Sequence, residues 1–290
     1  MAPSLLNLSL GLLAASQHVF AATTFQCPGP APPSKPVTAP GVQYKVLLNG
    51  LSRPRGIIVD PKGNLLLVEA KDKGLKRVVL NDATGMDVCV DSSDTIIPDT
   101  TLNHGIALSH DGKTLFASSK SNVYAYTYDA ETGTVGPAKD LINGMDQTDH
   151  VTRTLLIPQH NPDLLLVSRG SNDNVDKETA EIESGRSQLR IFKIADLLAS
   201  TEPVDYTAGE VLGWGLRNSV GVAEDPTNGH IWTVENSLDQ MKRNGDDIHQ
   251  SNPGEELNFH GLPNDTSSSV YGHNYGYPQC VSIADPSTVD

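Results

Sequence analysis

Short apolar runs recur along the chain in pairs, and a turn rich in Asp, Pro and Gly separates the two runs of each pair. The first pair lies in Gly56–Val68, where the turn is Asp60-Pro61-Lys62-Gly63. Pro and Gly interrupt an apolar run and allow the chain to reverse, so this pattern predicts two antiparallel strands. The same pattern returns in residues 105–117, 154–167 and 220–234.

The spacing of these pairs predicts a repeated unit. A period of ~50 residues leaves room for four strands per unit, which is typical of a β-propeller blade. Further apolar runs at 122–129 and 188–194 fit the third strand of a blade. The polar segments 168–187 and 235–279 are predicted to be loops at one end of the blades, and 194–199 favours a loop turn over a helix. We therefore expect an all-β fold.

The N-terminal region differs from the rest of the chain. Residues 1–21 contain the apolar stretch Leu5–Ala15 and end at Ala21, which is typical of a secretory signal peptide. No Lys or Arg precedes this stretch, so a buried N-terminal helix stays open as the alternative. Residues 22–42 are rich in Pro and predict an extended arm, and residues 43–290 would form the propeller domain. No later stretch is long enough to cross a bilayer, so we expect a secreted, extracellular protein without a membrane partner.

Composition narrows the class of protein and its partners. With 38% hydrophobic and 19% charged residues, the chain is typical of a globular protein. Its formal charge is −14 and its Lys and Arg residues do not cluster. Nucleic acid is therefore not expected as a partner, because binding phosphates requires clustered cations.

Three cysteines and one sequon bear on processing. In an oxidising compartment two cysteines can pair, and we hypothesise a Cys27–Cys89 bridge, with Cys280 paired beyond residue 290. The segment Asn264-Asp265-Thr266 has the pattern of an N-glycosylation acceptor in a composition typical of an exposed loop.

One segment carries side chains suited to a charged planar ligand. Gly215–Gly221 contains Arg217 and Asn218, and a guanidinium binds a carboxylate bidentately while an amide bonds a carbonyl. Taken alone, the pair fits a role in shaping a blade turn equally well. Two further segments follow it, the acidic Ser251–Phe259 and the aromatic Tyr271–Pro278.

Together these segments resemble the glucose and sorbosone dehydrogenase superfamily, and most closely its fungal pyranose dehydrogenases that use pyrroloquinoline quinone (PQQ). The resemblance covers residues 43–280. It implies a six-bladed β-propeller, of which about four blades lie in this chain, with PQQ and Ca²⁺ as cofactors. It also implies a pyranose or keto-sugar substrate and an external electron acceptor such as a cytochrome or another haem protein.

The resemblance implies which residues hold the cofactors. Arg217 and Asn218 would contact the quinone. The backbone carbonyls of Ser251 and Asn252 would bind Ca²⁺, an ion that takes oxygen ligands. A solvated acidic loop is the alternative for this second segment.

The resemblance also implies a general base. His150 would take the hydroxyl proton of the sugar, and Asp149 would orient its ring. His104 precedes the second strand pair in an analogous way, and spacing does not separate the two histidines.

Two arginines complete the predicted site. Arg55 opens the first blade and would point to one central opening with His104, His150 and Arg217. Arg169 follows an inner strand, where bacterial members of the superfamily carry an acid. We assign it to the cofactor, with a loop salt bridge as the alternative.

Two other functions stay open. A propeller hydrolase of the lactonase or strictosidine-synthase type would place calcium or carboxylates at the channel without a quinone. A non-catalytic binding propeller would need neither the quinone nor a catalytic calcium or carboxylate. Addition of PQQ and Ca²⁺ discriminates among the three, because a reducible chromophore is expected only of the dehydrogenase.

Overall fold

The chain forms two compact units. In the computed structural model, the first unit comprises residues 1–49 and 82–89, and the second comprises residues 50–81 and 90–290. The predicted signal peptide, 1–21, lies outside the described residues, which are 27–70, 73–81, 87–243, 245–285 and 287. Within these residues, no helix combines the length and the hydropathy needed to cross a membrane.

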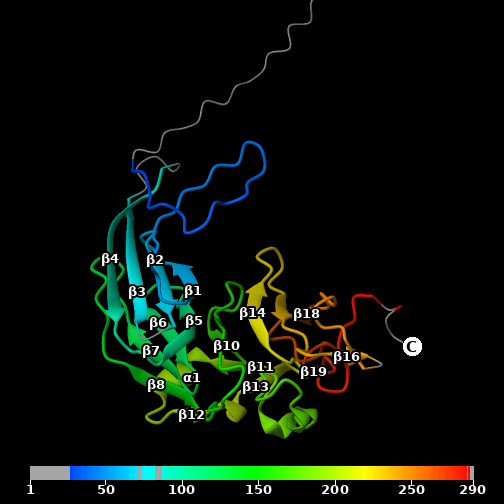
Figure 1. Cartoon of the computed structure of the whole chain (residues 1–290). Helices are drawn as coiled ribbons and strands as arrows, with labels where there is room; N and C mark the ends of the chain where they lie inside the picture. The colour runs from blue at the N-terminus through cyan, green and yellow to red at the C-terminus, as the bar shows by residue number, and fades with distance from the viewer. Residues whose placement is uncertain (1–26, 71–72, 82–86, 244, 286, 288–290) are drawn as a thin grey trace, which may run out of the picture. The chain divides into compact units, whose positions relative to one another are not determined.

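Four antiparallel sheets follow one another along the second unit as blades (Figure 1). Blade one contains β1 (Pro54–Val59), β2 (Leu65–Glu69), β3 (Gly74–Asn81) and β4 (Cys89–Ile97). Blade two contains β5 (Leu102–Leu108), β6 (Thr114–Ser119), β7 (Val123–Thr127) and β8 (Lys139–Asn143). Blade three contains β9 (Leu155–Leu156), β10 (Leu164–Arg169), β11 (Gln188–Lys193) and β13 (Glu210–Trp214). Blade four contains β14 (Ser219–Glu224), β15 (Ile231–Glu235) and β18 (Glu256–Gly261).

Short elements connect or extend these sheets. The strand β12 (Val204–Asp205) pairs in parallel with β8, and β19 (His273–Asn274) pairs in parallel with β13. Both extend the outer edge of a blade. The other elements are the hairpin β16 (Lys242–Arg243) with β17 (Asp246–Asp247), the helix α1 (Ile194–Ala199) and the 3₁₀ turns η1 (Lys177–Ala180), η2 (Ile182–Ser184) and η3 (Tyr206–Ala208).

The Asp-Pro turn between β1 and β2 shows why the repeated motif forms. The Asp60 carboxylate accepts backbone N–H bonds from Lys62 at 2.8 Å and Asn64 at 2.9 Å, and Gly63 adopts a φ of +81°. Asp thus closes the turn while Gly takes a left-handed conformation. The hydroxyl of Tyr128, which follows β7, also donates to Asp60 at 2.7 Å, so the turn of blade one is bonded to blade two.

Alternate residues of each central strand face different neighbouring blades. In β10, Leu165 lies in the core that contains Phe116 of blade two, whereas Leu166 lies in the core that contains Ile231 of blade four. Both leucines are fully buried. Side chains of a strand alternate between its two faces, so one strand joins two cores.

The structure confirms the predicted all-β fold and the four blades. The four predicted strand pairs are β1–β2, β5–β6, β9–β10 and β14–β15, and the predicted third strands are β7 and β11.

Two local predictions were wrong. Residues 194–199 form the helix α1, because Leu197 packs into the core of blades two and three, and such packing stabilises a helix too short to persist alone. The predicted loop 235–279 contains β18, which pairs with β15. The hydrophobic pattern of this segment does not predict the strand, because the buried residue is the polar His260 while the apolar Leu257 is exposed.

The hypothesised disulfide forms within the first unit. Cys27 and Cys89 are bonded, with their Cα atoms 5.9 Å apart, a normal separation for a bridge. Lys45 and Asp87 form an ion pair at 2.7 Å in the same unit. The thiol of Cys280 is exposed and bonds to no cysteine of the described residues, and its predicted partner stays a prediction.

Packing between blades predicts a contrast between two leucines. Leu165→Ala should lower the free energy of unfolding by about 2–5 kcal/mol, because a buried leucine leaves a cavity. Leu257→Ala is the matched control, since this side chain is 65% exposed, and should change it by less than about 0.5 kcal/mol. Urea titration of both variants measures the difference, and equal losses would contradict the assignment of the core.

Candidate active site

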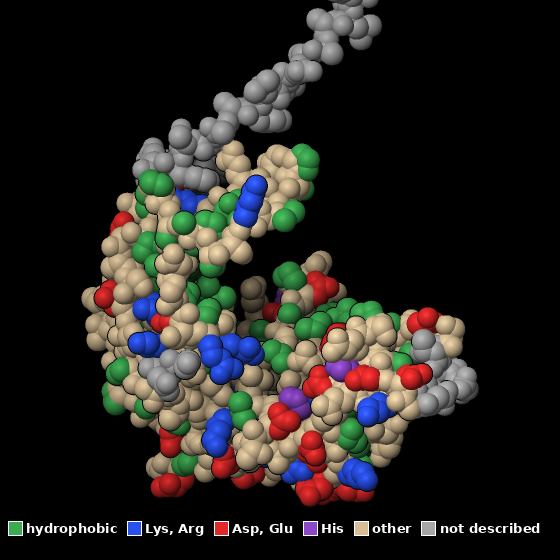
Figure 2. Space-filling model, in the orientation of Figure 1, with side chains coloured by type: hydrophobic (Ala, Val, Ile, Leu, Met, Phe, Trp, Pro, Cys, Tyr) green, Lys and Arg blue, Asp and Glu red, His purple; other side chains and the backbone are tan. Residues whose placement is uncertain are grey.

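A hollow of about 290 Å³ opens where loops from blades two, three and four meet. One wall follows β8, a second joins β13 to β14, and a third joins β15 to β18. Figure 2 shows His side chains close to Asp and Glu side chains over blades three and four. The lining consists of His150, Arg217, Asn218, Asn236, Ser237, Leu238, Asp239, His249, Asn252 and Glu255. Four predicted site residues are therefore brought together.

Buried polar side chains hold the loop that presents His150. The φ of His150 is +40°, a left-handed conformation that is uncommon outside Gly. The fully buried Arg153 donates to the carbonyls of Met145 and His150, both at 2.8 Å. Gln147 donates to the carbonyl of His150 at 3.2 Å and to that of Ser171 at 2.9 Å. These bonds stabilise the unusual backbone and fix the place of the ring.

The hydrogen bonds of the His150 ring determine its tautomer. Nδ1 lies 2.8 Å from the Ser171 hydroxyl and 3.1 Å from the Ser171 carbonyl. That hydroxyl donates its proton to the carbonyl of Asp173 at 2.8 Å, so it accepts from His150. Nδ1 therefore carries the hydrogen and Nε2 keeps its lone pair. Burial, reinforced by the charge of Arg217, lowers the pKa of His150 below its usual 6.5, which favours the neutral ring.

The orienting role predicted for Asp149 belongs to Ser171. The Asp149 carboxylate accepts the backbone N–H of His150 at 2.8 Å and forms no bond with the ring. Adjacent residues of a tight loop bring a carboxylate to the neighbouring backbone more readily than to the neighbouring ring. Asp149 thus supports the loop, and it does not line the hollow.

His104, the alternative base, has both ring nitrogens engaged. Its Nδ1 accepts from Arg55 Nε at 3.1 Å, and its Nε2 lies 3.1 Å from the hydroxyl of Thr154. This hydroxyl donates to the carbonyl of Val220 at 2.6 Å. Burial, with the nearby charge of Arg55, lowers the pKa of His104 to about 4. His104 is neutral near pH 7 but has no nitrogen left to accept a proton.

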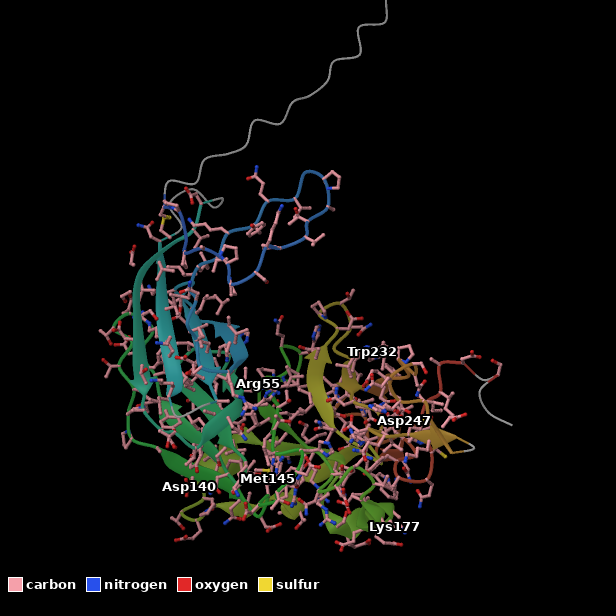
Figure 3. The ribbon with its side chains drawn as sticks, in the orientation of Figure 1. Arg55, Asp140, Met145, Lys177, Trp232 and Asp247 are labelled. Atoms are coloured by element: carbon pink, nitrogen blue, oxygen red, sulfur yellow. A yellow bond between two sulfur atoms is a disulfide. The ribbon has the colours of Figure 1, made fainter. Side chains whose placement is uncertain are left out.

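A chain of hydrogen bonds from Arg55 through His104 and Thr154 to Val220 runs across the innermost strands. Of the four side chains predicted to share one opening, His150 and Arg217 line the hollow, whereas Arg55 and His104 do not. Figure 3 shows Arg55 on the side of blade one that faces the other blades. The equivalence drawn between His104 and His150 was wrong. Ile106 and Leu155 occupy matching positions in the registers of blades two and three. His104 lies two residues before Ile106, and Arg153 lies two residues before Leu155. The counterpart of His104 is therefore Arg153.

Arg217 joins the loop of Asn174 to the wall formed by residues 236–239. A guanidinium has five N–H donors, and four from Arg217 bond to the carbonyl and side-chain oxygens of Asn174, the carbonyl of Asn236 and the carboxylate of Asp239. One N–H donor is left for a ligand. The Asn218 amide donates to the side chain of Asn236 at 3.2 Å.

Arg169 lies in the interior and does not line the hollow. Its Nε donates to the side-chain oxygen of Gln147 at 2.9 Å, and its guanidinium lies 5.7 Å from the centre of the Tyr206 ring. Arg169 thus bonds to Gln147, which holds the His150 loop, and it also donates to the carbonyl of Gly185 at 3.4 Å. Its role toward a cofactor stays a prediction.

Of the two residues predicted to bind calcium, one lines the hollow, and Glu255 of the same segment also lines it. Asn252 lines it, whereas Ser251 does not. The Asn252 side chain bonds to the backbone of Ser282 at 3.2 Å and Ala284 at 2.8 Å.

Sequence reasoning missed the wall formed by residues 236–239. The signal for it was present, since β14 and β15 pair with Ser219 opposite Glu235. The residues that precede β14 and those that follow β15 must therefore meet. No described residue donates a hydrogen bond to the carbonyls of Ser237 and Leu238.

The chain is similar to curated sugar dehydrogenases. A PQQ-dependent sugar dehydrogenase from Hypocrea jecorina is 49% identical over 250 residues, 86% of this chain and 57% of that protein. A PQQ-dependent pyranose dehydrogenase from Coprinopsis cinerea is 40% identical over 270 residues, 91% of this chain and 36% of that protein. The chain thus spans less than two thirds of these relatives.

Solved structures and a family model agree with this similarity. The calcium structure of a Trichoderma reesei enzyme of carbohydrate-active family AA12 matches with a TM-score of 0.81 and 46% identity, over 92% of this chain and 64% of that one. The holo form of the PQQ domain of the C. cinerea pyranose dehydrogenase matches with a TM-score of 0.82 and 37% identity, over 91% and 63%. A family model described as TrAA12-like matches residues 36–290. The resemblance read from the motifs is confirmed, and the chain belongs to the TrAA12-like family.

Proposed function

We propose that this chain forms the base-bearing part of a secreted dehydrogenase that oxidises a pyranose or keto-sugar with PQQ and Ca²⁺. The electrons pass to an external acceptor such as a haem protein. The names of the similar proteins support PQQ and a sugar. The observation that carries the proposal is His150, whose hydrogen bonds leave a basic nitrogen beside Arg217 at one hollow.

Oxidation of a sugar hydroxyl removes a proton from oxygen and a hydride from carbon. His150 Nε2 takes the proton, because the neutral ring has its lone pair available there. PQQ, when bound, supplies the acceptor for the hydride and its two electrons. The free N–H donor of Arg217 and the amide of Asn218 suit the carboxylates and carbonyls of the quinone.

The charges around the hollow support a cation beside the quinone. Asp239 and Glu255 carry carboxylates, and PQQ is itself a carboxylic acid. Without a cation, repulsion between these groups would oppose binding. Ca²⁺ takes six to eight oxygen ligands, and the wall of Ser237, Leu238 and Asp239 with Asn252 supplies carbonyl and carboxylate oxygens.

Calcium should therefore strengthen PQQ binding by the full chain. We expect at least about tenfold tighter binding, a gain of 1.4 kcal/mol or more, with Ca²⁺ than after chelation. Fluorescence titration with PQQ measures the affinity, and Mg²⁺ is the matched control because it prefers a smaller octahedral site. Equal affinity with and without Ca²⁺ would contradict the assigned role. PQQ binding without any absorbance change on adding a pyranose would favour a non-catalytic binding propeller. Hydrolysis of a lactone in the absence of quinone would favour a lactonase.

Replacement of His150 should lower turnover in the enzyme that contains this chain. We expect His150→Gln to reduce kcat by about 100- to 10,000-fold, since it removes the proton acceptor. His104→Gln is the matched control, because that ring has no free nitrogen, and should cost less than about tenfold. If His150→Gln retained more than about a tenth of the parental turnover, the base would have to lie elsewhere.

The pH profile checks the same assignment. Below the pKa of His150 the ring is protonated and cannot accept a proton, so kcat/KM should rise with pH. Burial and Arg217 lower this pKa, so the rise should reach its plateau at a pH below that expected for a free histidine. His150→Gln should abolish this rise, whereas His104→Gln should keep it. A parental profile without the rise would exclude His150 as the titrating base.

A further inference from the structure

A second cavity lies on a different part of blade three from the hollow. Its volume is about 450 Å³, and none of its lining residues belongs to the hollow. Its walls come from β11, α1, the segment before β13 and the loop that follows β18. Its lining includes the apolar side chains of Phe192, Leu197 and Val204, and the carboxylates of Asp196 and Glu210.

The sequon singled out in the sequence stands at the rim of this cavity. Asn264 and Thr266 line the cavity and are exposed. No described residue forms a hydrogen bond with either side chain. Their neighbour Asp265 holds the turn instead, since its backbone N–H donates to Leu262 at 3.3 Å and its carboxylate accepts the N–H of Ser267 at 3.1 Å. The acceptor amide and the hydroxyl two residues later are thus available to a glycosyltransferase.

We propose that Asn264 carries an N-linked glycan whose first sugar sits in this cavity. In the transfer, the Asn264 amide nitrogen bonds to C1 of an N-acetylglucosamine. The bond from C1 to a polyprenyl pyrophosphate breaks, the pyrophosphate leaves with the electron pair, and the amide proton passes to a base of the transferase. The first sugar is then tethered at the mouth of the cavity, where a high effective concentration offsets a weak intrinsic affinity.

The lining suits the two kinds of surface that a sugar presents. Sugar rings bear apolar C–H faces, which pack on aromatic and aliphatic side chains such as Phe192 and Tyr271. Their hydroxyls donate to carboxylates, here Asp196 and Glu210. The Tyr271 hydroxyl donates to Glu210 at 2.7 Å, so an aromatic ring and a carboxylate lie side by side at this cavity.

This inference rests on the secretion proposed above, and the test separates the two. The full chain is expressed in yeast behind a host signal peptide, which ensures entry to the secretory pathway whether or not residues 1–21 act as a leader. Peptide mass spectrometry should show a glycan on Asn264. Thr266→Ala should abolish it, and the matched variant Thr266→Ser, which keeps the sequon, should retain it. Secreted protein with unmodified Asn264 would overturn the site.

The position of the sugar is tested separately. In the glycosylated chain, magnetisation should transfer between the N-acetyl methyl protons and the ring protons of Tyr271 or Phe192. Tyr271→Phe keeps the ring and should retain the transfer. Tyr271→Ala removes the ring, so the transfer between the N-acetyl methyl protons and the protons of residue 271 should disappear. A glycan on Asn264 without transfer to either ring would overturn its place in the cavity.

Discussion

The packing of each blade against its neighbours is the constraint on which the rest of the structure depends. Blades two and three are covered on both faces, so a strand such as β10 is buried from Leu164 to Arg169. Blades one and four are covered on one face by the described residues. The other face of blade four carries Trp232, labelled in Figure 3, with the exposed Val234 and Leu257. Apolar residues thus also occupy the face of blade four that no described sheet covers. Where two described blades are neighbours, the alternation of apolar residues buries these side chains between their sheets.

Because the inner strands are fixed, the loops at their ends have little freedom. The His150 loop depends on Arg153, a fully buried guanidinium that forms no ion pair with the described residues. Burial, and the nearby charge of Arg169, lower its pKa to about 9. An unpaired buried cation is costly unless hydrogen bonds compensate. Its bonds to the carbonyls of Met145, His150 and Thr152 supply part of this compensation and satisfy three backbone oxygens, while Nε has no partner among the described residues.

Sequence reasoning about the fold succeeded where the signal was local and periodic. The turns and the apolar runs that flank them are contiguous, and their positions follow from strand geometry. The cofactor role of Arg217 and Asn218 stays a prediction. Sequence reasoning failed at β18, because the core residue is His260, and at Asp149, because a carboxylate beside a histidine in sequence need not reach its ring. Contacts such as that between Ser171 and His150, 21 residues apart, depend on how two loops lie together. No short pattern encodes them.

The two histidines near the inner strands show what decides the chemistry. Each ring bonds to one hydroxyl, and the partner of that hydroxyl determines the tautomer. Thr154 donates to Val220, so it accepts from Nε2 of His104, while Arg55 donates to the opposite nitrogen. Ser171 donates to Asp173, so it accepts from Nδ1 of His150. Both nitrogens of the His104 ring are thereby engaged in hydrogen bonds, whereas the His150 ring presents Nε2 as a base. Burial lowers the pKa of both rings.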